Sequence, residues 1–200
     1  MSHANPFNKA TFVTSAAAID QLPEDHGKEI AFIGRSNAGK SSAINAITGI
    51  KGLAKTSKTP GRTQLMNCFS LDETRRLIDL PGYGFAKVPT AVKAKWSNFI
   101  NDYLSERACL SGLVLLMDIR HPLKPLDQQM LDWAQTYEVP VLLLLTKADK
   151  LKRGALMDTE RKVKSVLENL NVDIVSFSVT QTLGVEKARK ILQAWIGVEA

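Results

Sequence analysis

The sequence is poor in cysteine and has no long apolar run. Its two cysteines, Cys68 and Cys109, are single and widely spaced, which is unlike a disulfide framework or a metal site. The longest apolar stretches, residues 113–117 and 139–145, are far shorter than the roughly 20 residues that a membrane-spanning helix requires. The first residues have neither the basic start nor the apolar segment of a secretory signal. We therefore expect a cytoplasmic protein with free thiols and no membrane partner.

Internal repeats and low-complexity stretches are also absent. The 200 residues, of which 44% are apolar and 23% charged, are enough for one globular domain with a three-layer core. We predict a single domain over residues 28–200, with an N-terminal extension, residues 1–27, packed on it. The extension has one candidate strand at residues 11–14. We expect a monomer.

Acidic residues are outnumbered by basic ones, and the net charge is +6. Several basic residues follow the first predicted helix closely, among them Lys55, Lys58 and Arg62. A basic balance is typical of a protein with a nucleic-acid partner. A solvated surface that also binds an anionic ligand has the same composition, so charge alone leaves both interpretations open.

Strand-like apolar runs alternate with helical patterns from residue 28 onward, which predicts an α/β fold. We expect three layers, with helices on both faces of a mostly parallel six-stranded sheet. The runs 64–70 and 75–79 are joined by a short turn and predict a hairpin, so one strand is antiparallel. The predicted strands are residues 29–33, 64–70, 75–79, 112–118, 140–146 and 173–178, and the predicted helices are residues 40–48, 90–106, 125–137, 155–169 and 184–196.

The most specific motif is GRSNAGKS at residues 34–41, which fits the phosphate-binding pattern G-x-x-x-x-G-K-S/T. It lies between a predicted strand and a predicted helix, as the motif requires. Backbone N–H groups of such a loop and the helix N-terminus surround a phosphate. Lys40 is then expected to reach the β- and γ-phosphates and Ser41 to bind Mg²⁺. The alternative is an ordinary glycine-rich turn at a helix start.

Three later segments narrow the choice of ligand to a guanine nucleotide. Two of them directly follow a predicted strand, and the third lies at the end of the last one. Residues 79–82, DLPG, offer a carboxylate for the metal shell and the Gly82 N–H for a γ-phosphate. Residues 146–149, TKAD, offer the Asp149 carboxylate, which can accept from both guanine N1–H and the 2-amino group. Residues 177–179, FSV, offer a backbone N–H for the guanine oxygen. Ligands bind at the carboxyl ends of strands in open α/β sheets, so we expect these segments to meet.

Taken in order, these motifs resemble those of the translation-factor-related GTPases, within the superfamily of TrmE, Era, EngA, EngB and septin. The match is closest to the EngB family of bacterial GTP-binding proteins, also called YihA or YsxC. The similarity extends from about residue 10 to residue 195. The segments that carry it are GRSNAGKSS at 34–42, TSKTPGRTQ at 56–64, LIDLPGYGFAKV at 77–88, LMDIRHPLKPLDQQM at 116–130 and LLTKADKL at 144–151.

The resemblance implies a P-loop GTPase with a Ras-like G domain, slow GTP hydrolysis and a nucleotide-dependent switch. It implies large ribosomal subunit assembly, with ribosomal RNA and proteins as partners, and a need for the protein in cell division and septation. Lys40, Thr63 and Gly82 take the catalytic roles, and Ser41, Thr63 and, through water, Asp79 bind Mg²⁺. The residues implied to bind GTP or GDP are Gly34, Arg35, Ser36, Asn37, Ala38, Gly39, Lys40, Ser41, Ser42, Gly61, Arg62, Thr63, Gln64, Leu65, Asp79, Leu80, Pro81, Gly82, Thr146, Lys147, Ala148, Asp149, Ser178, Val179 and Thr180.

Two positions depart from the common pattern of guanine-nucleotide proteins. Thr146 stands where many have Asn, and its shorter side chain predicts a weaker tether to the phosphate loop and modest affinity. Tyr83 stands where Ras-like GTPases have the Gln that orients the attacking water. We hypothesise that Asn37 helps to bind K⁺, or that a partner such as the ribosome accelerates hydrolysis. A ribosome-binding module with incidental hydrolysis stays open, and a small-molecule kinase is a weaker alternative.

Five further residues have a functional and a structural interpretation. His121 is a candidate catalytic base, but we favour structural support of its loop, and for Arg120 we favour a salt bridge over an arginine finger. Trp96, Phe99 and Tyr103 recur at helical spacing, which favours core or groove lining over a base-stacking platform. For Lys55, Lys58 and Arg62 we favour contact with ribosomal RNA phosphates over a solvated loop, because the loop would order on GTP and present these charges only then.

Overall fold

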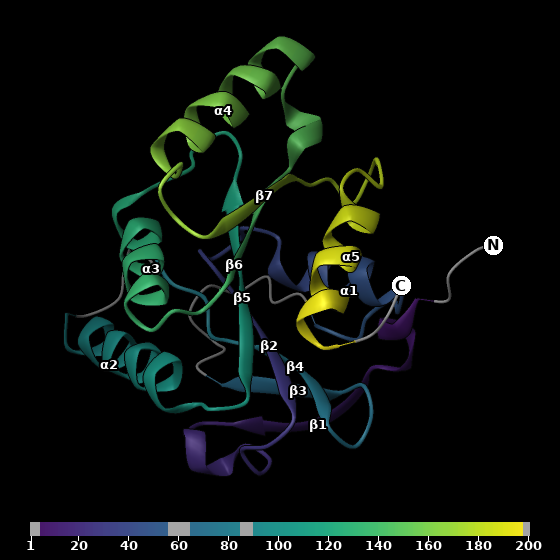
Figure 1. Ribbon diagram of the computed structural model, residues 1–200, viewed down its shortest axis with the longest axis vertical. Coiled ribbons are helices and arrows are strands. Elements are labelled where there is room, and N and C mark those ends of the chain that lie inside the picture. The colour runs from purple at the N-terminus through teal and green to yellow at the C-terminus, as the bar shows by residue number, and fades with distance from the viewer. Residues whose placement is uncertain (1–4, 56–64, 85–89, 198–200) are drawn as a thin grey trace.

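The computed structural model describes residues 5–55, 65–84 and 90–197, with the backbone alone for residues 90–93. Its sheet has the order β1-β3-β4-β2-β5-β6-β7 (Figure 1). Strand β3 is antiparallel to both neighbours, and all other pairs are parallel. The predicted class, with one antiparallel strand, is confirmed. The strands are β1 (Thr11–Ala16), β2 (Lys28–Gly34), β3 (Met66–Ser70), β4 (Arg75–Asp79), β5 (Leu110–Asp118), β6 (Val141–Thr146) and β7 (Val172–Ser176).

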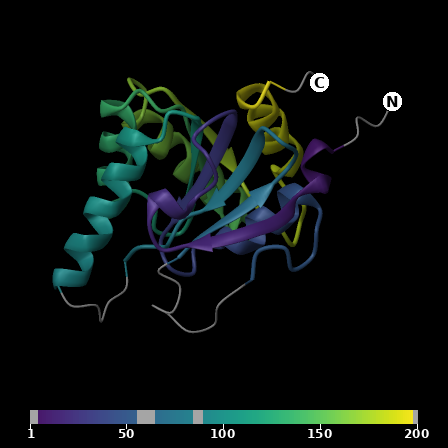
Figure 2. The ribbon, with the colours of Figure 1, turned by 90° about the horizontal axis from the view of Figure 1, so that it is seen from below.

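Helices cover both faces of the sheet (Figures 1 and 2). On one face, α2, α3 and α4 contribute to a single apolar cluster, and on the other face α1 and α5 contribute to a second. Successive residues of β5 alternate between the two clusters: Leu113 joins the first and Val114 the second, and both are fully buried. This explains why the strand is apolar at every residue. The helices are α1 (Lys40–Thr48), α2 (Thr90–Glu106), α3 (Pro125–Thr136), α4 (Arg153–Val166) and α5 (Val185–Trp195).

The sheet has seven strands instead of the expected six, because β1 joins its edge. Strand β1 pairs antiparallel with β3, from Thr11 opposite Ser70 to Ala16 opposite Met66. The N-terminal segment thus contributes to the same sheet as the rest of the chain, while the division of the chain at residue 28 stays a prediction. Short 3₁₀ helices not predicted from the sequence are η1 (Pro6–Lys9), η2 (Ile19–Gln21) and η3 (Ala148–Lys150).

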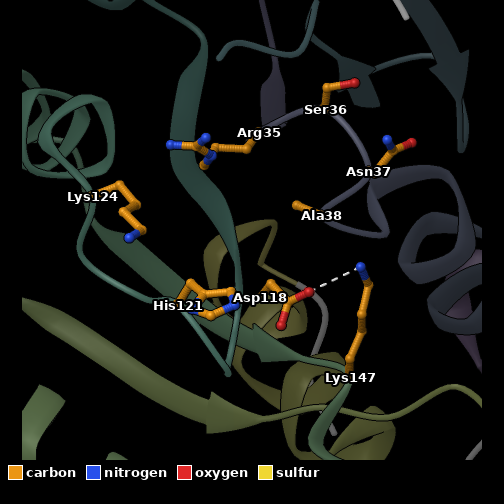
Figure 3. Close-up of a pocket in the computed structure, with 8 residues that line it drawn as sticks. All are labelled: Arg35, Ser36, Asn37, Ala38, Asp118, His121, Lys124 and Lys147. Atoms are coloured by element: carbon orange, nitrogen blue, oxygen red, sulfur yellow. Dashed lines mark ion pairs between the residues drawn. The ribbon is translucent and has the colours of Figure 1, made fainter. Parts of the chain in front are cut away.

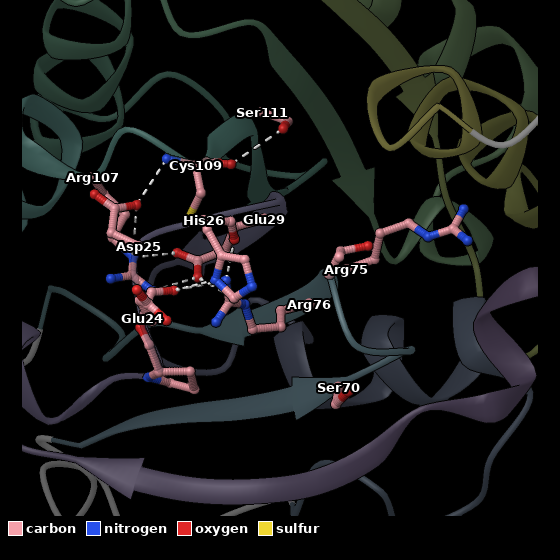
Figure 4. A network of polar contacts seen from close by, with 12 residues as sticks. Glu24, Asp25, His26, Glu29, Ser70, Arg75, Arg76, Arg107, Cys109 and Ser111 are labelled. Carbon is pink, nitrogen blue, oxygen red and sulfur yellow. Dashed lines mark hydrogen bonds and ion pairs between the residues drawn. The ribbon is translucent and has the colours of Figure 1, made fainter.

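A buried ionic cluster lies near the start of β2 (Figure 4). The carboxylate of Glu29, fully buried, accepts from Arg107 Nε at 3.2 Å and Nη2 at 3.1 Å, and Arg76 Nε lies 3.8 Å away. The Tyr103 hydroxyl donates to the same carboxylate. Arg107 Nη2 also donates to the Pro23 carbonyl at 2.7 Å. The cluster therefore fastens the segment that precedes β2 to the end of the sheet opposite the predicted phosphate loop.

Helix length gives one further result. None of the helices in the described part of the chain has both the length and the apolar character needed to span a bilayer.

Candidate functional site

The structure gathers the predicted segments at the carboxyl ends of four neighbouring parallel strands. Strand β2 leads into residues 34–41, β4 into residues 79–82 and β6 into residues 146–149. Asp118, at the end of β5, lies opposite Thr146 in the strand register. Residues that are more than a hundred positions apart in the sequence therefore line one edge of the sheet, as expected for a ligand site in an open α/β sheet.

The phosphate loop, residues 34–41, has the turn that its sequence predicts. Gly39 is left-handed, with φ of +91°, immediately before α1 begins at Lys40. Gly34 packs so closely on β5 that a Cβ there would lie 2.8 Å from the Leu116 carbonyl oxygen. The N-terminal N–H groups of α1 consequently point into the loop, where they and the helix dipole favour a phosphate.

Lys40, Ser41 and Asp79 are brought together at this loop. The Lys40 ammonium is ion-paired with the Asp79 carboxylate, and their side chains are only 16% and 7% exposed. Ser41 Oγ donates to the Lys55 carbonyl at 3.2 Å. The two oxygen donors, a hydroxyl and a carboxylate, are of the kind that Mg²⁺ prefers. No three His, Cys, Asp or Glu side chains converge anywhere in the described ranges, so these residues do not form an all-protein metal cage.

Thr146 reaches the phosphate loop despite its short side chain, and whether this tether is weaker than that of an asparagine stays a prediction. Its buried hydroxyl lies 2.7 Å from the Ala38 carbonyl oxygen and 3.1 Å from that of Met117. A hydroxyl has one proton, so it donates to one of these carbonyls at a time. Because β6 ends directly beside the loop, a threonine is long enough to tether it. The prediction of modest nucleotide affinity is not tested by this contact.

Lys147 is held by a carboxylate on the neighbouring strand. Its ammonium lies 2.9 Å from Asp118 Oδ2. Arg120 donates two hydrogen bonds to the same carboxylate, from Nε at 2.9 Å and from Nη2 at 2.7 Å. Hydrogen bonds from Arg120, and then from Lys147, hold the pKa of Asp118 well below its usual range. The salt-bridge interpretation of Arg120 is confirmed. We predicted no role for Asp118 from the sequence, where the only indication of one is a carboxylate at the end of a buried strand.

Asp149 is oriented by the segment that follows β7. The Ser178 hydroxyl donates to Asp149 Oδ1 at 2.7 Å, and the Lys150 ammonium lies 3.2 Å from Oδ2. The hydrogen bond from Ser178 is the main cause of a lowered Asp149 pKa. The hydroxyls of Ser178 and Thr180 are 3.0 Å apart, while Val179 is 44% exposed. The sequence indicated only a backbone role for this segment, and the side-chain role of Ser178 was missed.

Tyr83 turns away from the sheet edge and into the core. It is 2% exposed, and its hydroxyl donates to Asp127 Oδ1 at 2.5 Å. Burial, and then the Asp127 charge, raise the Tyr83 pKa well above its usual value. This phenol cannot orient a water at the phosphate loop, in agreement with the sequence-based expectation. Leu80 is fully buried, so only its backbone is available to a ligand.

A cavity of about 360 Å³ lies beside the phosphate loop (Figure 3). Basic side chains dominate its wall, and its one carboxylate, Asp118, is already paired with Lys147. The loop containing His121 forms the side opposite the phosphate loop, and the His121 N–H donates to the Asp118 carbonyl at 2.9 Å. The residues that line the cavity are Arg35, Ser36, Asn37, Ala38, Asp118, His121, Lys124 and Lys147.

Some predicted ligands lie outside the described residues: Gly61, Arg62, Thr63 and Gln64, together with the basic residue Lys58. Leu65 is described and is 38% exposed. Ser42 lies in the first turn of α1.

Comparison with known proteins identifies relatives along the whole chain. A family model described as "50S ribosome-binding GTPase" matches residues 29–147. The chain is 51% identical over 200 residues to a "Probable GTP-binding protein EngB" of Coxiella burnetii (strain CbuK_Q154), covering 98% of this chain and 97% of the relative. It is 55% identical over 196 residues to the protein of the same description in Photorhabdus laumondii, covering 97% and 93%.

Solved structures show the same fold. A crystal structure of "a probable GTP-binding protein engB" matches with a TM-score of 0.69 at 21% identity, covering 86% of this chain and 100% of that one. A structure of Era in complex with MgGDPNP and nucleotides 1506–1542 of 16S ribosomal RNA matches with a TM-score of 0.62 at 19% identity, covering 85% and 57%.

Proposed function

The chain belongs to the EngB family of GTP-binding proteins and is a GTPase, and we propose that it acts as a nucleotide-dependent switch in assembly of the large ribosomal subunit. The observation that carries the proposal is the meeting of three loops at one sheet edge. The phosphate loop supplies N–H groups, residues 79–82 lie beside it, and residues 146–149 present Asp149. In this proposal the triphosphate lies at the end of the edge that holds the phosphate loop, and the purine base lies at the end that holds Asp149.

Guanine recognition rests on Asp149. Ser178 and Lys150 hold its carboxylate in the ionised form, which only accepts hydrogen bonds. Guanine offers two adjacent donors, N1–H and the 2-amino group, whereas adenine lacks this pair. Ser178, Val179 and Thr180 close the site around the base. Lys147 lies next to Asp149, where its stem covers the base plane once the nucleotide is bound.

The metal site would be formed by Ser41 directly, by Asp79 through water and by Thr63. Mg²⁺ typically keeps phosphate and water oxygens as its remaining ligands, which agrees with the small number of carboxylates here. The ion neutralises charge on the phosphates when bound. Lys40, paired with Asp79 in this structure, exchanges that partner for the β- and γ-phosphates, and the Gly82 N–H meets the γ-phosphate.

Stimulation by potassium is proposed for Asn37. The residue is exposed in the phosphate loop and has a left-handed backbone with φ of +65°. In this proposal its side-chain oxygen coordinates a monovalent cation beside the phosphates, where the cation supplies positive charge that an arginine finger supplies in other GTPases. This part of the proposal would be contradicted if GTP turnover is equal in sodium and in potassium and if ribosomes do not change it.

The proposed partner is the large ribosomal subunit or its precursor, in the cytoplasm, and we propose that the protein is also needed for normal cell division and septation. The net charge of +6 supports a phosphate-rich partner. Arg35, His121 and Lys124 form a basic wall next to the nucleotide site, so a bound RNA phosphate would lie close to the loops that change with nucleotide state.

Two experiments test the function. Asp149→Asn replaces an acceptor with a group that can donate, so GTP affinity should fall while xanthosine nucleotides bind better; unchanged GTP affinity would overturn the guanine assignment. The second experiment compares binding of purified 50S particles to the GDP form and to the form with a non-hydrolysable GTP analogue. We expect tighter binding with the analogue. Equal binding would instead identify a ribosome-binding module whose hydrolysis is incidental.

A further inference from the structure

Tyr83 is built into the phosphate loop through its backbone. Its N–H donates to the Gly34 carbonyl at 3.2 Å, and its own carbonyl accepts from the Ser36 N–H at 2.8 Å. These two bonds continue the parallel pairing of β4 with β2 beyond the ends of both strands. Gly82 is drawn so close to the loop that a Cβ there would lie 3.1 Å from the Gly34 carbonyl oxygen. The position of Gly82 therefore depends on how firmly Tyr83 is held.

The side chain of Tyr83 is held from the opposite direction. Its hydroxyl donates at 2.5 Å to Asp127, which is fully buried. Asp127 cannot shift freely, because its second oxygen accepts from the Lys124 N–H at 2.8 Å and so caps the start of α3. The Tyr83 ring also contacts Trp96 of α2 at a centroid distance of 5.4 Å, and Trp96 Nε1 donates to the Pro81 carbonyl at 3.2 Å. Contacts with α2 and α3 thus hold the residues on both sides of Gly82, which are Pro81 and Tyr83.

We propose that Tyr83 is a positioning residue for GTP hydrolysis: anchored on Asp127, it holds the Gly82 N–H at the place where the γ-phosphate is sensed. The phenol itself points away from the phosphate loop and touches no reacting atom. Gly84, the next residue, has a φ of +77°, a conformation that glycine adopts without strain. The inference rests on the role proposed for Gly82.

The test is Tyr83→Phe, with Tyr103→Phe as a matched control. Both changes keep the ring and remove a buried hydroxyl that donates to a buried carboxylate. Tyr103, however, donates to Glu29 at the opposite end of the sheet. Single-turnover GTP hydrolysis should fall at least about tenfold in Tyr83→Phe, the size expected when a hydrogen bond to a buried charged group is lost. GDP affinity should stay within about twofold, because GDP has no γ-phosphate to sense. Tyr103→Phe should hydrolyse GTP at the wild-type rate.

Three results would overturn the inference: a wild-type rate in folded Tyr83→Phe, an equal loss of rate in Tyr103→Phe, or a GDP affinity that falls in parallel with the rate. Asp127→Asn is a second variant if Tyr83→Phe does not fold. Its amide has one acceptor oxygen for two donors, the Tyr83 hydroxyl and the Lys124 N–H, so the anchor should weaken and the hydrolysis rate should fall below that of wild type. A wild-type rate there would also contradict the anchor. Gly82→Ala tests the proposed function separately. Full GTPase activity of that variant would contradict the role proposed for Gly82. An inactive Gly82→Ala together with a fully active Tyr83→Phe would contradict only the anchoring role of Tyr83.

Discussion

Replacing Arg107 with methionine should destabilise the protein by about 3 kcal/mol, because it leaves the buried Glu29 carboxylate without its closest cation. Removing one partner of a buried ion pair typically costs roughly 3–5 kcal/mol. We place this case at the lower end, because the Tyr103 hydroxyl and the Arg76 guanidinium remain beside Glu29. The same change also removes the hydrogen bond that Arg107 donates to the Pro23 carbonyl.

Urea unfolding followed by circular dichroism measures the change in the free energy of unfolding directly. In thermal unfolding of a chain of this length, each kcal/mol lowers the Tm by about 2–4 °C, so a fall of roughly 6–12 °C is expected. The control is Arg161→Met. Arg161 pairs with Asp158 on the surface, where the two side chains are 78% and 59% exposed, and loss of such a pair costs at most about 1 kcal/mol.

A double variant separates lost attraction from an uncompensated buried charge. Adding Glu29→Gln to Arg107→Met removes the orphaned charge, so the double variant should be more stable than Arg107→Met alone. The reasoning is refuted if Arg107→Met unfolds within 1 kcal/mol of wild type, or if the second change gives no recovery. GTP binding should survive in all three variants, because the cluster lies at the end of the sheet opposite the phosphate loop.

Three other outcomes are expected. Thr146→Val removes the hydroxyl that tethers the phosphate loop, so GDP should dissociate about tenfold faster in stopped-flow release, the effect of about one hydrogen bond; an unchanged rate would show that the contact contributes nothing. Ser178→Ala should let the Asp149 pKa rise toward its usual range, so guanine-nucleotide affinity, which needs the carboxylate, is lost at a higher pH than in wild type as the solution is acidified; identical pH profiles would contradict this. Burial raises the pKa of Cys68 to about 11 and of Cys109 to about 12, so at pH 8 at most about one thiol in a thousand is ionised, and Ellman's reagent should react slowly until the protein unfolds; rapid labelling of the native protein would refute it.

The elements were predictable from the sequence because their signals are local. The strand exits after β2, β4 and β6 were found from an apolar run followed by a characteristic loop, and helices α1 and α2 have the predicted bounds. The ends of other elements shifted: β7 stops at Ser176, before the predicted residue 178, and α4 begins and ends earlier than its pattern indicated. Apolar periodicity continues past the last backbone hydrogen bond of an element, so it locates an element better than its ends.

The extra strand and the buried cluster were not predictable in the same way. Strand β1 is mostly exposed, so its residues lack a strong apolar pattern, and only its pairing with β3 identifies its place in the sheet. Glu29 and Arg107 are charged residues that would ordinarily lie on the surface. Their burial becomes favourable only because the fold brings them together from 78 positions apart.

The sequence by itself determined the motifs of this protein: the phosphate loop, the carboxylate that we propose selects guanine, and the order of strands and helices are all found in contiguous segments. Tertiary structure alone decided how those segments are held. Thr146 reaches a carbonyl 108 positions away, Ser178 orients Asp149, and Tyr83 is anchored on Asp127. The physical reason is that a hydrogen bond between side chains depends on distances of a few tenths of an ångström, and strand order, not sequence spacing, sets those distances.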